Sequence, residues 1–365
     1  MGKEMLEPLW PDHHPDFDRL LRVFLRRGTP DRVPFIELFA DPEIIEALAG
    51  EKPTRKDSKI LDEREAGLLR QIKFCYRMGW DFVWVFVDVP FIRGELAAED
   101  TAILPRDRRS WVDESRGIIA SMEDFERYPW PTQAMVNYAD LEFVSRNLPD
   151  GMKIVATTCG VLEWVMWLTG FTPFALALYD QPNLIEALFQ KIGDIYAETY
   201  AVAAGMDNVG ALFLGDDMGY KTGTFIKPEY LQQYVFPRQK RLAEITHQHG
   251  HPFLLHSCGN LQVIMDDLVN EVGIDGKHSF EDSYLTAGEA KRRYGDRISI
   301  LGGVDMGMLA SASEEEVRAY TRRLLEECMP GGGYALGTGN SVANYIPVRN
   351  YLAMLDEGMK VGRYR

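Results

Sequence analysis

A histidine and a cysteine stand two residues apart in the apolar stretch 252–260, which reads PFLLHSCGN. In an extended strand, residues i and i+2 project from the same face, so His256 and Cys258 would lie side by side. An imidazole and a thiolate together are ligands typical of Zn²⁺. Asn260 is a suitable N-cap for a helix over 261–268, which would place the pair where a strand gives way to a helix. The alternative is an ordinary core histidine beside a free cysteine.

Eight short apolar runs alternate with helical patterns along the chain. Most runs are apolar throughout, as expected for parallel strands that are buried on both faces. The alternation predicts an α/β fold, a single (β/α)₈ TIM-type barrel over 1–365, with an N-terminal helical extension. An inserted excursion, which can form a hairpin, is expected over 91–118 after the second strand. The predicted strands are 33–39, 82–88, 153–159, 210–217, 252–260, 273–281, 298–305 and 332–340.

Nearly every predicted strand ends in a residue that can ligate a metal or move a proton. Because the active sites of such barrels lie at the C-terminal ends of the strands, this ring of residues predicts a site at the barrel mouth. Burying so many carboxylates is costly unless cations, protons or substrate groups compensate. Asp305 and one of Asp216 and Asp217 can instead be helix caps. The ring comprises Glu37, Asp41, Asp88, Cys159, Asp216, Asp217, His256, Cys258, His278, Glu281, Asp305 and Asn340.

A zinc ion held by the histidine and the cysteine needs one or two more protein ligands. Glu281 ends the next predicted strand and Asn340 ends the last one, so both can reach the barrel axis. His278 is an alternative third ligand, although a strand that stays regular through Glu281 would turn it to the opposite face. Glu281 can also be an acidic residue at the N-terminus of a helix.

Composition narrows the classes of partner. The chain has 365 residues, of which 46% are hydrophobic, and a formal net charge of −15, which argues against binding to nucleic acid or to anionic membranes. No stretch approaches the roughly 18 uninterrupted apolar residues of a membrane span, and the N-terminal segment lacks a secretory signal pattern, so we expect a cytoplasmic protein. The four cysteines are widely scattered, which predicts free thiols.

Several motifs resemble those of the superfamily that contains the uroporphyrinogen decarboxylases and the related zinc methyltransferases, which serve corrinoid proteins. Cobalamin-independent methionine synthase is a more distant relative of that superfamily. The resemblance runs over most of the chain and implies a (β/α)₈ barrel with its site at the strand C-termini. It is densest in GDDMG at 215–219, HSCG at 256–259, AKRRYGD at 290–296 and LGGVD at 301–305, and includes Pro228, Tyr230 and Pro237.

The resemblance also implies a set of metal ligands. In the zinc methyltransferases an H-x-C pair, an acidic residue one strand later and a second cysteine on the last strand hold the metal. His256, Cys258 and Glu281 match the first three places. Asn340 stands where the family has the second cysteine, and its amide oxygen would be a weak ligand. A site with one thiolate would be more Lewis acidic than a site with two.

The first strand separates two branches of this superfamily. True uroporphyrinogen decarboxylases carry an arginine-rich N-terminal segment that holds the carboxylates of the substrate, whereas here the segment 35–41 reads FIELFAD. Glu37 and Asp41 would repel such a substrate. Asp88 does match the decarboxylase aspartate after the second strand, but it is one residue of that constellation.

These observations favour a zinc-dependent methyltransferase that moves a methyl group between a small donor and the cobalt of a separate corrinoid protein. Loss of the second cysteine favours a methoxylated aromatic donor, and therefore O-demethylation, over methylation of a thiol acceptor. The chain lacks a D-x-H-x-x-G motif of its own for holding a corrinoid, so a partner protein would supply it. The oligomeric state stays open, with a homodimer as one possibility.

Acids and aromatic side chains near the strand ends complete the predicted site. Asp88, Asp217 and Glu37 are the candidate catalytic acids. Trp164, Trp167, Phe39 and Tyr220 are the candidate substrate-binding residues, which could form a wall against a flat ring or could be plain core.

Two other function classes stay open. One is a decarboxylase or lyase that acts on a smaller acid without metal, with His256 as a general acid. The other is a binding protein that keeps the barrel and has lost catalysis.

Overall fold

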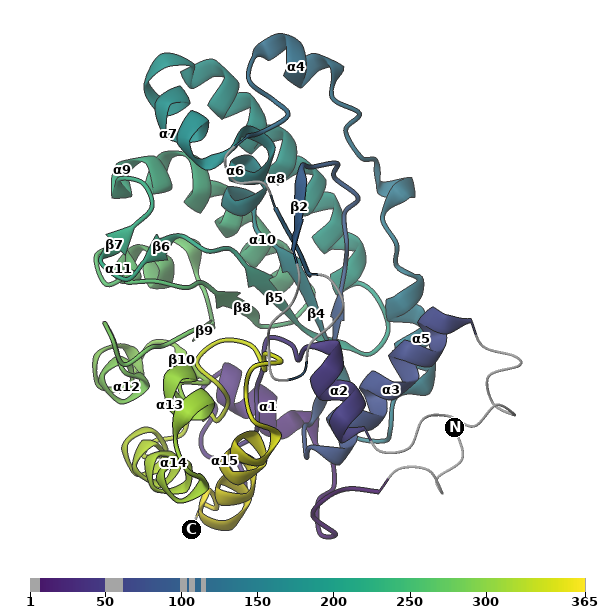
Figure 1. Ribbon diagram of the computed structural model, residues 1–365, viewed down its shortest axis with the longest axis vertical. Helices are drawn as coiled ribbons and strands as arrows, with labels where there is room; N and C mark the ends of the chain where they lie inside the picture. The colour runs from purple at the N-terminus through teal and green to yellow at the C-terminus, as the bar shows by residue number, and fades with distance from the viewer. Residues whose placement is uncertain (1–6, 50–61, 99–103, 105–108, 113–115, 365) are drawn as a thin grey trace.

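A parallel sheet of seven strands forms the centre of the protein (Figure 1). The computed structural model describes residues 7–49, 62–98, 104, 109–112 and 116–364. Neighbouring strands follow one another in the chain and all pairs are parallel, which is the arrangement of a (β/α) barrel, as predicted. In order, the strands are β1 (Phe82–Phe86), β4 (Lys153–Cys159), β5 (Val209–Gly215), β8 (Phe253–His256), β9 (Gly276–His278), β10 (Ser299–Leu301) and β11 (Tyr334–Ala335).

The first predicted strand, 33–39, occupies the eighth place beside β11 but is not a regular strand. Two single parallel bridges, Phe35 with Leu336 and Ala40 with Val342, join it to the end of the sheet. Pro34 within this segment has no backbone N–H to donate, which limits a continuous ladder of hydrogen bonds. The prediction of eight regular strands is therefore corrected to seven strands and one irregular extended segment.

Helices connect successive strands and pack around the sheet (Figure 1). The helical region that follows β4 is broken near residues 170 and 181, where Gly170 adopts a φ of +81° and Pro182 opens the next helix. The helices before β4 are α1 (Phe17–Phe24), α2 (Pro42–Leu48), α3 (Glu63–Arg77), α4 (Met122–Arg127) and α5 (Ala139–Asn147). Those between β4 and β8 are α6 (Val161–Thr169), α7 (Phe171–Asp180), α8 (Pro182–Ala204), α9 (Pro228–Tyr230) and α10 (Phe236–Gln248). Those that follow are α11 (Met265–Asp267), α12 (Ala287–Tyr294), α13 (Met306–Ser311), α14 (Glu314–Cys328) and α15 (Val348–Val361).

Two smaller predictions have different outcomes. The excursion after the second strand contains an antiparallel hairpin of β2 (Glu95–Ala98) and β3 (Arg109–Val112), as expected. The helix predicted over 261–268 is shifted, because α11 begins only at Met265 and continues as a π-helix over Leu268–Val272. The Oδ1 atom of Asn260 instead accepts a hydrogen bond from the backbone N–H of Gln262 at 3.3 Å, which favours a local turn.

No single helix among the described residues is long and apolar enough to cross a membrane. Helices α6 and α7 pass a test of length and composition only when taken together, and they are bent by 97° at their junction.

A buried ion network ties the first segment to β1 at the N-terminal end of the strands. Asp81, which directly precedes β1, accepts a hydrogen bond from Nη1 of Arg19 at 2.6 Å and lies 3.3 Å from Nη2 of Arg32. It also accepts a hydrogen bond from the backbone N–H of Asp16 at 3.0 Å, just before α1. The network therefore joins α1, the irregular first segment and the first strand of the sheet.

We expect Asp81→Asn to lower the free energy of unfolding by about 3–5 kcal/mol, because two buried arginines would lose their shared counter-charge. Asp31→Asn is the matched control. Asp31 also pairs with Arg19, but its side chain is 65% exposed, so the loss should be about 1 kcal/mol or less. Urea unfolding of both variants measures the difference, and equal losses would show that the buried network does not hold the barrel together.

Candidate functional site

A cavity of about 230 Å³ opens at the carboxyl ends of β4, β5 and β8. One part of its lining is aromatic and another part carries acids, a histidine and thiols. This is the end of the sheet at which the sequence predicts the site. The lining residues are Leu38, Phe39, Phe86, Thr157, Thr158, Cys159, Glu163, Trp167, Gly215, Asp217, His256, Cys258 and Asn340.

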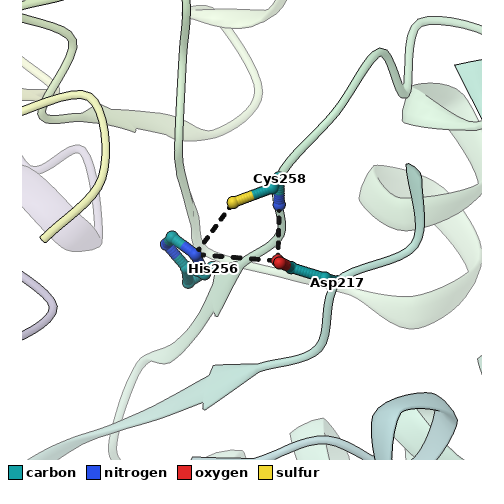
Figure 2. A group of neighbouring side chains, drawn as sticks. All are labelled: Asp217, His256 and Cys258. Atoms are coloured by element: carbon teal, nitrogen blue, oxygen red, sulfur yellow. Dashed lines mark hydrogen bonds and ion pairs between the residues drawn. The ribbon is translucent and has the colours of Figure 1, made fainter. Parts of the chain in front are cut away.

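Three side chains in this cavity converge on one point (Figure 2). Nε2 of His256 lies 3.4 Å from Sγ of Cys258 and 3.7 Å from Oδ1 of Asp217. In the described part of the chain this is the one group of three His, Cys, Asp or Glu residues whose ligand atoms all lie within 4.8 Å of one another. Tetrahedral ligands at zinc distances stand about 3.3–3.8 Å apart, so the distances of the histidine nitrogen from the other two donors fit a zinc ion.

The strands position these three residues. His256 is the last residue of β8 and pairs with Gly215, the last residue of β5, in parallel register. Asp217 lies two residues after the end of β5, and Cys258 lies two residues after the end of β8. The parallel register therefore brings these two residues next to each other. The backbone N–H of Cys258 donates to Oδ1 of Asp217 at 2.7 Å, which fixes the carboxylate beside the thiol.

Burial sets the protonation of the group in the absence of a metal. It lowers the pKa of His256 to about 3, so the imidazole is neutral and one ring nitrogen carries a lone pair. Burial first, and the neighbouring Asp217 second, raise the pKa of the Cys258 thiol. Burial also raises the pKa of Asp217. A metal that binds here must therefore displace the thiol proton.

The two weaker predicted ligands behave differently. The side-chain nitrogen of Asn340 lies 3.3 Å from Sγ of Cys258, and a half-turn of the amide would place its oxygen there instead. Glu281 does not join the group. Its Oε1 atom instead accepts a hydrogen bond from the hydroxyl of Tyr284 at 3.4 Å. Glu281 as a metal ligand stays a prediction, and Asp217 holds the third place in the observed group.

Of the other predicted catalytic acids, neither lines the cavity. The Glu37 carboxylate is buried and accepts hydrogen bonds from the backbone N–H and the hydroxyl of Thr338, at 3.0 and 2.6 Å. Burial raises its pKa to about 8. Asp88 follows β1 as an exposed residue, and partial burial raises its pKa while Arg93 opposes the rise.

The predicted aromatic wall is partly present. Phe39 and Trp167 line the cavity, together with Phe86, whose ring centroid lies 5.7 Å from that of Phe39. Trp164 is buried against Trp167, with ring centroids 4.9 Å apart, and is not a lining residue. Tyr220 is 52% exposed and also lies outside the lining.

Sequence reasoning missed Glu163, which lines the cavity from the first turn of α6. Burial, then Asp217, then Asp216 raise its pKa well above the usual range, which favours the protonated carboxyl. An acid in the first turn of the helix after the third strand was the available signal.

Asp305 is a helix cap, as anticipated, whereas Asp216 bonds the N-terminus of a helix that it does not itself precede. Asp216 accepts hydrogen bonds from the backbone N–H groups of Leu162 and Glu163 at the start of α6, at 3.4 and 3.1 Å. A Cβ atom on Gly160 would lie 2.0 Å from Cγ of Asp216, so this close approach requires a glycine. Asp305 caps α13 through the N–H of Met308 at 3.0 Å.

Lys277 on β9 is a second functional candidate that the sequence did not reveal. Its side chain is buried, and Nζ donates to the backbone carbonyls of Ser257 at 3.1 Å and Ser279 at 2.7 Å. Burial lowers its pKa to about 8, while Cys258 and Asp217 act against that shift. The ammonium therefore bridges the segment of the H-x-C pair to the end of the next strand.

Comparison with known proteins places the chain in a family. The family model for uroporphyrinogen decarboxylase matches residues 77–360. The chain belongs to the uroporphyrinogen decarboxylase family. This membership agrees with the resemblance that the motifs indicate.

The relatives within this family have two kinds of activity. The uroporphyrinogen decarboxylase of Thioalkalivibrio sulfidiphilus is 28% identical over 194 residues, 51% of each chain. The methylcobamide:CoM methyltransferase MtaA of Methanosarcina barkeri is 28% identical over 170 residues, 46% of this chain and 48% of MtaA. The match thus spans about half the length of these curated relatives.

Solved structures agree with the fold. A methyltransferase from Methanosarcina mazei aligns with a TM-score of 0.64 at 16% identity, over 94% of this chain and 97% of that one. A B12-independent methionine synthase from Shewanella sp. W3-18-1 aligns with a TM-score of 0.52 at 14% identity, over 90% and 95%. At such low identity these likenesses establish the shared barrel of this family and nothing about substrate.

We expect Cys258→Ser to lose most of the bound zinc, because a hydroxyl is a far poorer zinc ligand than a thiolate. Cys159→Ser is the matched control, since Cys159 lines the same cavity but lies outside the group of three. Metal content of both variants, measured after loading with zinc and removal of the excess, decides the point. Full zinc in Cys258→Ser, or loss of zinc in Cys159→Ser, would mean that the ligand set is wrong.

Proposed function

We propose that this protein is a zinc-dependent methyltransferase that moves the methyl group of a methoxylated aromatic to the cobalt of a separate corrinoid protein. The observation that carries the proposal is the convergence of Asp217, His256 and Cys258 in a cavity with a partly aromatic lining. The relative MtaA, named as a methylcobamide:CoM methyltransferase, supports methyl transfer that involves a corrinoid.

His256, Cys258 and Asp217 would hold the metal, with Asn340 as a weak fourth ligand and Glu281 as an alternative. When bound, zinc would supply a Lewis acid toward the ether oxygen of the donor. The three proteinaceous donors present one nitrogen, one sulfur and one oxygen. A set with one thiolate leaves more positive charge on the metal than a set with two, which suits an oxygen donor better than activation of a thiol.

The size and charge of the cavity favour a small neutral donor. Its volume of about 230 Å³ lies below the roughly 300–1,000 Å³ of pockets for drug-sized ligands. Phe39, Phe86 and Trp167 offer aromatic surfaces against which a single ring can pack. Among the described residues, the lining of the cavity includes Glu163 and Asp217 but no lysine or arginine, and one nearby cation, Arg93, lies over the ring of Trp167. A tetrapyrrole with many carboxylates would therefore meet more negative than positive charge here.

Glu163 supplies a proton in this proposal. When the methyl carbon passes to the nucleophilic cobalt, the C–O bond breaks and its electron pair stays on the oxygen. The oxygen then requires a proton, and the carboxyl of Glu163 is suited to donate one because burial and two neighbouring acids raise its pKa and favour its protonated form. Glu163 therefore acts as a general acid toward the leaving oxygen.

A decarboxylase or lyase that acts on a small acid without metal is the second candidate. The curated decarboxylases among the relatives favour it. In that case the acids that line the cavity, Glu163 and Asp217, would have to bind or protonate a carboxylate substrate. Their negative charge would repel such a substrate whenever they are ionised. Methylation of a thiol acceptor at the same metal group is a third candidate function.

A methyl-transfer assay tests the proposal. Zinc-loaded protein, 2-methoxyphenol and cob(I)alamin are combined without oxygen, with cob(I)alamin in place of the partner protein. We expect catechol and methylcobalamin in equal amounts, and at least a 100-fold lower rate for Cys258→Ser than for Cys159→Ser. Loss of one donor from a zinc site is the physical reason.

The same protein should not decarboxylate uroporphyrinogen at a detectable rate. Decarboxylation at a rate comparable to that of a genuine decarboxylase would overturn the proposal in favour of the second candidate. Demethylation of methylcobalamin by a thiol such as coenzyme M, with no reaction of methoxylated aromatics, would assign the third reading instead.

A further inference from the structure

We propose that His278 is a positioning residue that holds His256 in a single tautomer, with the proton on Nδ1 and with Nε2 free to bind a metal. This role of His278 serves catalysis only if the proposed metal site exists. The tautomer itself is a property of the metal-free chain. It can therefore be tested apart from the reaction.

A continuous line of hydrogen bonds runs from the last strand to the metal-binding group. Nε2 of His278 lies 3.1 Å from the backbone carbonyl oxygen of Thr338. Nδ1 of His278 lies 2.8 Å from Nδ1 of His256. The other nitrogen of His256, Nε2, faces Cys258 and Asp217 in the cavity. Both imidazole rings are buried, so water does not compete for these contacts.

The direction of each hydrogen bond follows from the carbonyl at one end. A carbonyl oxygen only accepts, so Nε2 of His278 must carry a proton. A neutral imidazole has one N–H, and therefore Nδ1 of His278 is an acceptor. The proton between the two rings then belongs to Nδ1 of His256, and Nε2 of His256 is left with a lone pair. Both rings lie side by side in the interior, where a neutral imidazole is favoured over an imidazolium.

The carbonyl at the start of this line is itself held in place. The N–H and hydroxyl of Thr338 both bond to the Glu37 carboxylate, at 3.0 and 2.6 Å. A Cβ atom on Gly302 would lie 2.3 Å from the Thr338 oxygen and 2.7 Å from Nε2 of His278, so a glycine is needed for the two to meet. Glu37 is thus an anchor for Thr338, which gives this buried acid a role although it is not among the residues that line the cavity.

The tautomer matters because the opposite one would block the site. With the proton on Nε2, His256 would direct an N–H at the point where the three ligand atoms converge. A neutral histidine as the hydrogen-bond acceptor also pushes less charge onto the ligand than the carboxylate found behind many zinc-bound histidines. That difference would leave a bound metal more Lewis acidic, in line with activation of an ether oxygen.

Nitrogen NMR of the metal-free protein, with ¹⁵N-labelled histidine rings, reads the tautomer directly. The chain has seven histidines, and the signals of His256 are assigned by their loss in His256→Gln. We expect the protonated nitrogen of His256 to be Nδ1 in the wild type. His278→Gln keeps one donor and one acceptor and should retain this tautomer. His278→Leu keeps similar bulk without an acceptor and should give mixed tautomers.

Zinc affinity, measured by competition with a chelator, provides a second readout. We expect a fall of about 10–100-fold in His278→Leu and a change of no more than a few-fold in His278→Gln. A merely structural role would lower the stability of both variants and leave the tautomer of His256 unchanged. If His278→Leu does not fold, the wild type and His278→Gln still decide the point.

Protonation of His256 at Nε2 in the wild type would overturn the inference. The same holds if His278→Leu keeps both the Nδ1 tautomer and the zinc affinity. Failure of the proposed function is distinguishable from this, because a protein with the expected tautomer that transfers no methyl group contradicts only the function.

Discussion

The cost of burying ionisable side chains at the carboxyl ends of the strands is the constraint on which the site depends. Most of these groups have partners within the protein. Asp216 is bonded by the N-terminus of α6 and by Gln239, Glu37 by Thr338, and Lys277 by backbone carbonyls. The contacts of Asp216 and Glu37 also hold distant segments of the barrel against one another.

Three groups at the same end have weaker compensation. Nε2 of His256 lies 3.4 Å from Sγ of Cys258 and 3.7 Å from the Asp217 carboxylate, and it offers a lone pair to the shared point. A cation would satisfy all three at once, whereas a purely apolar substrate would satisfy none. The fold thus gives most buried ionisable groups a partner within the protein and leaves these three facing a shared point. That arrangement is the basis of the metal chemistry that we propose.

Several parts of this arrangement follow from the sequence because they depend on local pattern. Apolar runs followed by capping residues predict the order of strands and helices, and the i, i+2 spacing predicts that His256 and Cys258 face the same way. The role of Asp305 as the N-cap of α13 could also be predicted, because it depends only on neighbouring residues in the chain. The irregular form of the first segment could not be predicted from local pattern. Its two bridges to the chain just after β11 join residues about 300 positions apart.

The remaining parts depend on register between strands, which one sequence does not give. β9 ends at His278, so the assumption of a regular strand through Glu281 failed and the position of Glu281 could not be predicted from alternation. The pairing of His256 with His278 in neighbouring strands placed His278 behind the cavity, as a partner of the ligand. Glu163 was missed because its side chain reaches the cavity from a helix, whereas the predicted ring was drawn from strand ends.

The central claim is a metal site with one thiolate, and X-ray absorption at the zinc edge tests it most directly. The wild-type protein, loaded with one equivalent of zinc, should show one sulfur neighbour at about 2.3 Å and nitrogen or oxygen neighbours at about 2.0–2.2 Å, including one histidine. Two sulfur neighbours would mean that another thiol, such as Cys159, completes the site. No sulfur neighbour, or no zinc retained, would contradict the account.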